Sequence, residues 1–120
     1  MEKNNPLKIK SYQFALHTLG IYKTLVAQKE FILSRQLIRS ATSIGANIEE
    51  ALQGQSKRDF LSKLSISLKE ANEAHYWLRL LKDGGFLQKD KADDAILKVV
   101  EIIKLLTAII KTTKKNLRGV

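Results

Sequence analysis

The most informative stretch of the chain is a run without charge near its middle. Although Asp, Glu, Lys and Arg make up 28% of the residues, none of them occurs between Ser40 and Ile48. On a repeat of 3.6 residues, the apolar positions of this region fall on one stripe with alternating spacings of four and three. These positions are Leu37, Ala41, Ile44, Ile48 and Ala51. The stretch therefore predicts a helix with one face in a hydrophobic core.

The opposite stripe of this helix consists of Arg39, Ser43, Ala46 and Glu50. A helix face in water normally carries more charge than this, so the pattern predicts a second buried face. The third predicted helix, from about 57 to 82, also has apolar residues on two opposite faces. Its outer face carries Trp77, whose exposure to water would be costly. We therefore predict an oligomer interface consisting of Arg39, Ser43, Ala46, Asn47, Glu50, Ile66, Glu70, Glu73 and Trp77.

The charges on these two faces allow two interpretations. The simpler one is surface ion pairing, worth roughly 0 to 1 kcal/mol. We favour pairing within or across subunits in an interface. In that case, removal of one partner is expected to cost on the order of 3 to 5 kcal/mol, because the other charge would be buried and unpaired.

Three further segments show helical periodicity, so the chain is expected to form four helices. Their approximate ranges are 7–27, 35–52, 57–82 and 88–115, followed by a tail at 116–120. Asn5-Pro6, Ser34 and Ser56 are typical of helix starts. No stretch alternates with a period of two, so no strand is expected. The sequence favours one all-α domain, residues 1–120, folded as an up-down-up-down antiparallel four-helix bundle.

The same spacing predicts which positions of the other helices face the core. In the first helix the expected stripe is Tyr12, Ala15, Leu19, Tyr22 and Val26. In the third helix it is Leu61, Leu64, Leu68, Ala71, His75 and Leu78. In the fourth helix it is Ala92, Ile96, Val99, Ile103, Leu106, Ile110 and Thr113.

Composition narrows the class of protein. The chain has no cysteine, which excludes disulfides and thiolate metal sites and suits a reducing compartment. The N-terminal residues lack the apolar segment of a signal peptide, and lysines interrupt the apolar run near the C-terminus. We expect a cytoplasmic protein that does not enter a membrane.

The net charge of +9 is concentrated at the two ends of the sequence. Residues 1–29 carry five lysines and one glutamate, residues 102–120 carry four lysines and one arginine without an acid, and the charges between them cancel. An up-down bundle brings both ends and the junction of the second and third helices to one pole. We predict that RNA or DNA phosphates bind there to Lys8, Lys10, Lys57, Arg58, Lys111, Lys114, Lys115 and Arg118.

This basic pole also contains Lys3, opposed by Glu2, Glu49, Glu50 and Asp59. Tyr12 is the only obvious aromatic residue near it that could stack on bases, so binding is expected to involve the backbone rather than the sequence of the nucleic acid. The alternative is that these lysines serve solubility alone.

The sequence offers little for catalysis. His75 lies on a predicted core stripe, where a buried, hydrogen-bonded histidine is expected. No arginine precedes either histidine at the spacing of the Arg-(x4–6)-His ribonucleases, and neither Glu70 nor Glu73 begins a Glu-x-x-His pair. Gly84-Gly85 is better interpreted as a helix end than as a phosphate-binding loop. We expect no enzyme, no metal, no cofactor and no small-molecule substrate.

Residues Gln36 to Ala51 contain the pattern Arg-Ser-x-x-Ser-Ile-x-x-Asn-Ile-x-Glu, followed by Phe60, Leu68–Ala71 and Tyr76–Leu78. Together these residues resemble the four-helix bundle proteins of the 23S ribosomal RNA intervening-sequence family, over nearly the whole chain. The resemblance implies a small bacterial protein that assembles as a ring, pentameric in relatives, with a basic surface that engages nucleic acid. It also implies a fold similar to that of the accessory proteins of diversity-generating retroelements. Ala51 departs from the glycine of many relatives.

Two functional hypotheses follow. The first is a non-enzymatic, homo-oligomeric bundle that binds RNA or DNA through its basic pole, without sequence specificity. The alternative is a protein-interaction module, or an accessory subunit, that docks a helical or reverse-transcriptase-like partner and has no direct role with nucleic acid. An RNA-processing enzyme is a third and weaker hypothesis.

Overall fold

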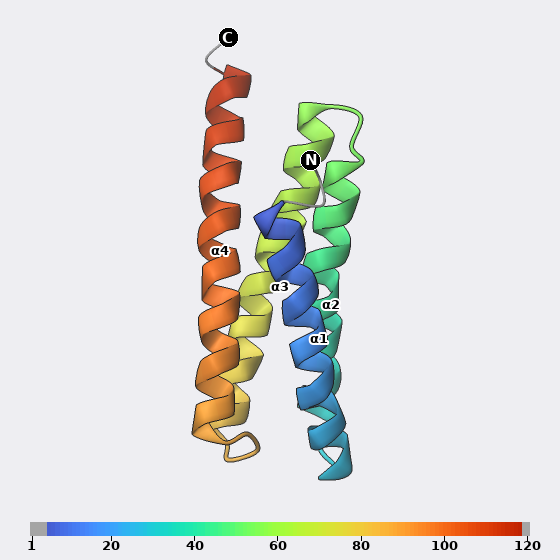
Figure 1. The fold of residues 1–120 in the computed structure, drawn as a ribbon, viewed down its shortest axis with the longest axis vertical. Coiled ribbons are helices and arrows are strands. Elements are labelled where there is room, and N and C mark those ends of the chain that lie inside the picture. The colour runs from blue at the N-terminus through green and yellow to red at the C-terminus, as the bar shows by residue number, and fades with distance from the viewer. Residues whose placement is uncertain (1–4, 119–120) are drawn as a thin grey trace.

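The computed structural model describes residues 5–118. Its four helices are α1 (Pro6–Ala27), α2 (Ile32–Leu52), α3 (Lys57–Asp83) and α4 (Lys89–Arg118). They run alternately up and down along a bundle of 52 × 23 × 22 Å (Figure 1). This arrangement confirms the predicted all-α four-helix bundle.

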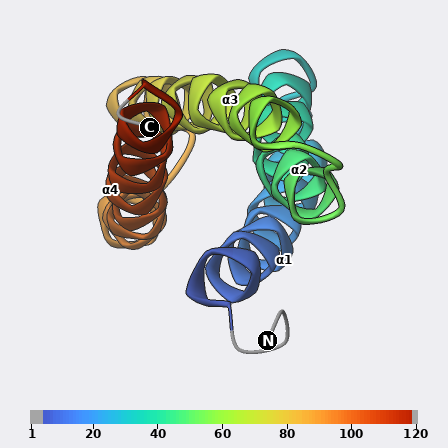
Figure 2. The same ribbon diagram turned by 90° about the horizontal axis from the view of Figure 1, so that it is seen from above.

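Neighbours in sequence are neighbours in space. Seen from above, the helices follow one another around the bundle, and α1 and α4 close it with the least contact of the four neighbouring pairs (Figure 2). The most extensive contact joins α2 to α3. The α2–α3 junction and the C-terminal end of α4 lie at the same end of the bundle, toward which α1 begins (Figure 1). The up-down order of the helices therefore brings the segments of the predicted basic pole toward one end of the bundle.

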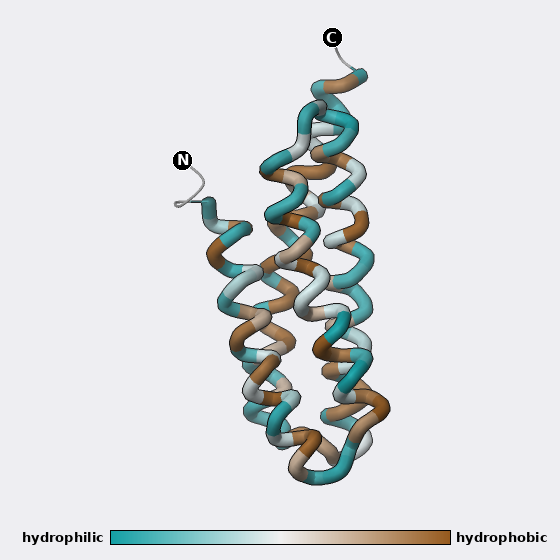
Figure 3. The backbone as a smooth tube through the Cα atoms, turned by 90° about the vertical axis from the view of Figure 1, so that its right-hand side faces the viewer, coloured by the Kyte–Doolittle hydropathy of each residue, from teal (hydrophilic) through white to brown (hydrophobic). Residues whose placement is uncertain are grey.

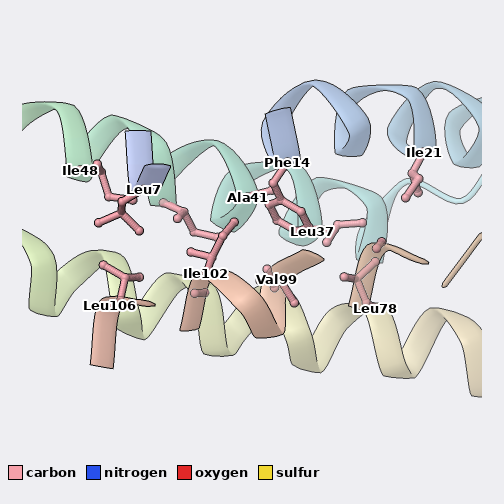
Figure 4. Packing of buried hydrophobic residues seen from close by; sticks show 14 of the residues in the cluster. Leu7, Phe14, Ile21, Leu37, Ala41, Ile48, Leu78, Val99, Ile102 and Leu106 are labelled. Carbon is pink, nitrogen blue, oxygen red and sulfur yellow. The ribbon is translucent and has the colours of Figure 1, made fainter. Parts of the chain in front are cut away.

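The core runs through the middle of the bundle (Figure 4). All five predicted core positions of α2, from Leu37 to Ala51, are at most 2% exposed. In α3 and α4 the predicted stripes contain both fully buried residues, such as Leu78 and Val99, and residues at the core's edge, such as Leu68 and Ile103. The predicted inward face of α2 is confirmed. Those of α3 and α4 are confirmed in part, because the core also contains Ser67, Ala74, Leu81, Ala95 and Ile102, which lie beside the predicted stripes.

The predicted core stripe of α1 is wrong. Tyr12 is 59% exposed and Leu19 is 40% exposed. The residues of α1 that face the core are instead Leu7, Ser11, Phe14, Thr18, Ile21 and Leu25. The prediction failed because α1 is apolar on two opposite sides, and apolar positions recur along its whole length (Figure 3).

Two polar residues, Ser11 and Thr18, lie on the buried face of α1 and made this face hard to recognise in the sequence. The hydroxyl of Ser11 donates to the Lys8 carbonyl at 3.1 Å, and the hydroxyl of Thr18 donates to the Phe14 carbonyl at 2.8 Å. Bonds of this kind let a hydroxyl enter a core without an unsatisfied group. The small Ser11 also allows a close approach to α2, because a Cβ at Gly45 would lie 3.4 Å from its Oγ.

The start of α2 also differs from the prediction. The helix begins at Ile32 rather than near Arg35, because the Glu30 carboxylate caps it. This carboxylate accepts hydrogen bonds from the backbone N–H groups of Leu33 at 3.0 Å, Ser34 at 2.6 Å and Ile32 at 3.2 Å. Ser34 is therefore not the cap; its hydroxyl donates to the Glu30 carbonyl.

Helix α4 continues to Arg118, three residues beyond the predicted end at 115. Two residues of the predicted basic pole, Lys3 and Glu2, lie outside the described residues.

Within residues 5–118, none of the helices combines the length and the hydropathy needed to cross a bilayer.

Candidate nucleic-acid interface and assembly surface

On the outer side of the α2–α3 contact, one arginine pairs with two glutamates. Arg39 on α2 reaches across to α3, with Nη2 2.8 Å from Glu73 Oε1 and Nη1 3.3 Å from Glu70 Oε1. The hydrogen bond to Glu73 is the main reason that the pKa of Arg39 is raised, and burial opposes this only in part. About two turns from Glu70 along α3, Lys63 pairs with Glu50 at 3.0 Å. We call the line of ion pairs that joins α2 to α3 the α2–α3 seam.

Small side chains keep the seam narrow. Ser67 Oγ on α3 donates to the Ile44 carbonyl on α2 at 2.9 Å, in the buried layer below the ion pairs. Asn47 turns back along its own helix, where its side-chain amide donates to the Ser43 carbonyl at 2.8 Å. Helix contacts this close require short side chains, which explains why this part of α2 carries no charge.

Trp77 lies at the edge of the core on the same side of α3. It packs against buried residues, and Tyr76 meets it edge-on with ring centroids 5.1 Å apart. Its Nε1 is buried and has no acceptor among residues 5–118. The side chain is thus partly buried within the chain.

The nine predicted interface residues lie on α2 and α3, and four of them, Arg39, Glu50, Glu70 and Glu73, take part in the ion pairs of the seam. Arg39, Glu70 and Glu73 are already paired within the chain. Arg39 remains 49% exposed and Glu73 34% exposed, whereas Glu70 is 14% exposed. Their pairing within a subunit is therefore established, and burial by a second subunit stays a prediction.

At the basic pole, the predicted binding residues fall into two groups. The group at the ends of α3 and α4 is exposed and makes no ion pair with any of the described residues: Lys57, Arg58, Lys111, Lys114, Lys115 and Arg118. The group on α1 is different. Lys8 is half-buried, and Lys10 pairs with Glu101 of α4 at 3.1 Å.

One cation was missed by the sequence analysis. Lys104 precedes Lys111, Lys115 and Arg118 at spacings of seven, four and three, which places all four on one side of α4. It is exposed, as they are. The helical spacing could have identified it. The stripe spans about 21 Å at 1.5 Å per residue.

The two histidines lie away from this pole. His75 is half-buried rather than fully buried, and its ring has no hydrogen-bond partner among residues 5–118, contrary to the expectation. Burial, together with the charge of Arg79, lowers its pKa. His17 lies 3.5 Å from Asp94, measured from Nε2 to Oδ2. Among the described residues, no group of three or more acids and histidines has a metal-binding arrangement.

A groove of about 450 Å³ lies between α1 and the start of α4. Its lining consists of His17, Gly20, Ile21, Thr24, Leu87, Asp90, Lys91 and Asp94. A Cβ at Gly20 would meet nothing within 4 Å, so this side of the bundle is loosely filled.

The motif on α2 can now be compared with known proteins. The family model of the 23S rRNA-intervening sequence protein matches residues 3–108. The chain belongs to this family. As a 23S rRNA-intervening sequence protein, it is also similar to a solved structure, a protein of unknown function of the S23 ribosomal protein family from Bacteroides thetaiotaomicron VPI-5482.

The two chains are 50% identical and superpose with a TM-score of 0.86, over 88% of this chain and 98% of the other. Among curated proteins, none matches this sequence. The residues of the Arg39–Glu50 pattern on α2 divide between two surfaces. Ile44 and Ile48 enter the core, whereas Arg39, Ser43 and Glu50 lie on the seam.

Proposed function

We propose that this protein is a non-enzymatic, homo-oligomeric bundle that binds RNA or DNA through its basic pole. The observation that supports the proposal is the group of six exposed cations at one end of the bundle, none of which forms an ion pair with a described acid. Nucleic acid is the polyanion that such a surface suits best, because each phosphate contact releases counterions.

Binding of this kind is expected to follow the backbone rather than the bases. The pole offers lysines and arginines on helix ends. Of the aromatic side chains near it, Phe60 packs against the core, and Tyr12 lies in the second turn of α1. Lysine contacts to phosphates position a nucleic acid without reading its sequence. An oligomer that aligned the poles of its subunits would multiply the charge without any further sequence feature.

The test is a salt titration with a charge-matched control. Binding of a labelled duplex and of a structured RNA is measured by fluorescence anisotropy between 50 and 200 mM salt. The pole variant replaces Lys111, Lys114, Lys115 and Arg118 with Gln. The control variant replaces an equal number of exposed cations elsewhere, Lys29, Arg35, Lys69 and Lys91, with Gln.

We expect the affinity of the original protein to fall steeply with salt. The slope of log K against log salt should decrease by about one for each phosphate contact that the pole variant loses. The control variant should keep most of the affinity. Tight binding that ignores both salt and the pole variant would refute the proposal, and no binding at 50 mM salt would favour the protein-interaction alternative.

A further inference from the structure

The cations of α4 form a line along the helix rather than a cluster at its end. Lys104, Lys111, Lys115 and Arg118 lie on one side of α4, and all four are exposed. The last three belong to the predicted pole. Lys104 lies about 10 Å from Lys111 toward the middle of the bundle, at 1.5 Å per residue. We call these four residues the α4 stripe.

The side of α4 that carries the stripe has neither bulky nor acidic side chains between the cations. Thr107 and Ala108 lie on this side, at spacings of three and four from the two lysines that flank them, and both are exposed. Residues 102–120 contain no acid, and the acid just before them, Glu101, is paired with Lys10 at 3.1 Å. A broad polyanion can therefore approach all four cations at once.

The stripe also faces away from the core of the bundle. The buried Leu106 and Ile110 stand about 200° and 240° around the helix from Lys104, at 100° per residue. Seen from above, α4 lies on the side of the bundle opposite α2 (Figure 2), and its C-terminal end extends beyond the α2–α3 junction (Figure 1). The other helices thus leave the stripe open along its whole length.

A straight line of cations without aromatic neighbours favours a double-stranded nucleic acid over a single strand. A duplex is stiff over a length of about 21 Å, and it carries about twice as many phosphates per unit length as one of its strands. A single strand loses conformational freedom when it lies along a straight surface, and proteins offset this cost by stacking its bases on aromatic side chains. Residues 102–120 contain no aromatic residue.

We propose that a double-stranded nucleic acid lies lengthwise along the α4 stripe, with its phosphates bound by the four cations. This inference rests on the nucleic-acid binding of the proposed function, and it names the class of nucleic acid and the surface that binds it. RNA and DNA duplexes share the phosphates on which the contact depends. Four phosphate contacts on one stripe correspond to a slope of log K against log salt of about −3.6, at about −0.9 per contact.

The first test compares two single substitutions that remove the same charge. Lys104→Gln removes the cation of the stripe that lies farthest from the pole, and Lys57→Gln removes an exposed cation of the pole that lies on α3. Affinity for a labelled duplex longer than the stripe is measured by fluorescence anisotropy. At about 100 mM salt, Lys104→Gln should lower the affinity about five- to tenfold, the effect of one phosphate contact, and Lys57→Gln less than about twofold.

The second test compares a duplex with a single strand of the same length that cannot pair with itself. At about 100 mM salt the original protein should bind the duplex about sixfold more tightly, because each contact releases more counterions from a duplex than from a single strand. DNA and RNA duplexes are measured separately, and the one bound more tightly identifies the source of the ligand.

The controls separate loss of charge from misfolding. Lys104→Arg keeps the cation and should keep the affinity of the original protein. Circular dichroism checks the helical content of every variant, and glutamine is a good helix former at an exposed position. A loss of affinity in Lys104→Arg as large as that in Lys104→Gln would overturn the phosphate contact at this residue.

The outcomes also separate this inference from the proposed function. If neither a duplex nor a single strand binds at 50 mM salt, the proposed function itself is wrong. If nucleic acid binds and Lys57→Gln weakens binding as much as Lys104→Gln does, the proposed function stands and the lengthwise contact is overturned. Equal affinities for the duplex and the single strand would overturn the assignment of a double-stranded ligand.

Discussion

The α2–α3 pair and the α1–α4 edge are held together in different ways. A buried hydrogen bond from Ser67 and the ion pairs of Arg39 join α2 to α3 across a narrow seam. Helices α1 and α4 make the least contact of the neighbouring pairs; Lys10 pairs with Glu101 at 3.1 Å, and a groove of about 450 Å³ lies nearby. Helices α2 and α3 therefore form the rigid half of the bundle.

The largest expected effect compares one isoleucine from each region. Ile44 of α2 is fully buried, whereas Ile21 of α1 is 6% exposed and lines the groove. Ile44→Ala should lower the free energy of unfolding by about 3 to 5 kcal/mol, because it leaves a cavity in a closed core. Ile21→Ala should lower the free energy of unfolding by only about 2 kcal/mol, because the space it leaves opens into the groove and does not form a closed cavity.

Urea denaturation, followed by circular dichroism at equal protein concentrations, gives both values. Leu97→Ala serves as a surface control and should stay within about 0.5 kcal/mol of the original protein. Equal costs at Ile44 and Ile21 would mean that the two regions are packed equally well, contrary to the comparison.

A smaller effect is expected at the start of the rigid half, where Glu30 caps α2. Burial raises the pKa of Glu30, but the hydrogen bonds from Leu33, Ser34 and Ile32 together lower it below its ordinary value of 4.5. The ionised cap therefore stabilises the fold above pH 4.5, and this contribution is lost as the pH falls through the lowered pKa.

Glu30→Gln should accordingly cost about 1 kcal/mol at pH 7. The difference from the original protein should shrink as the pH is lowered below about 4.5, as measured by urea denaturation at several pH values. A difference that stays constant down to pH 3 would show that the charge of the cap does not matter.

The smallest effect concerns the ion pairs of the two regions. In dilute, monomeric protein, Arg39→Gln should cost about 0.2 to 1 kcal/mol, because its partly exposed pairs are screened by water. Lys10→Gln, at the α1–α4 edge, should cost less than Arg39→Gln, because Lys10 has a single, exposed partner.

The same Arg39 substitution also tests whether a neighbouring subunit covers the seam. In the assembled protein its cost should rise toward 3 to 5 kcal/mol, if a neighbouring subunit covers the seam and leaves Glu70 and Glu73 unpaired away from water. Equal costs in the monomeric and the assembled backgrounds would place the seam outside the interface.

Several features of the fold followed from local sequence. The core face of α2, from Leu37 to Ala51, was predicted correctly because the opposite face of the helix carries small and charged residues instead of large apolar ones. Ser56 caps α3 as expected, with its hydroxyl accepting from the Asp59 N–H at 3.0 Å. The candidate site was predicted in part: the exposed cations of α3 and α4 lie at one pole, but Lys10 is paired and Lys104 was missed.

The sequence by itself determined the four helices, their order and, in large part, the inward faces of α2, α3 and α4. Hydrophobic periodicity depends only on nearby residues, and it identifies the buried face of a helix when large apolar residues gather on one side. It could not determine the buried face of α1, whose two sides are both apolar. Only packing against α2 and α4 decided that Phe14 enters the core and that Leu16 points outward. The pairing of Arg39 with two glutamates 31 and 34 residues away is likewise tertiary, because a contact between helices depends on their register.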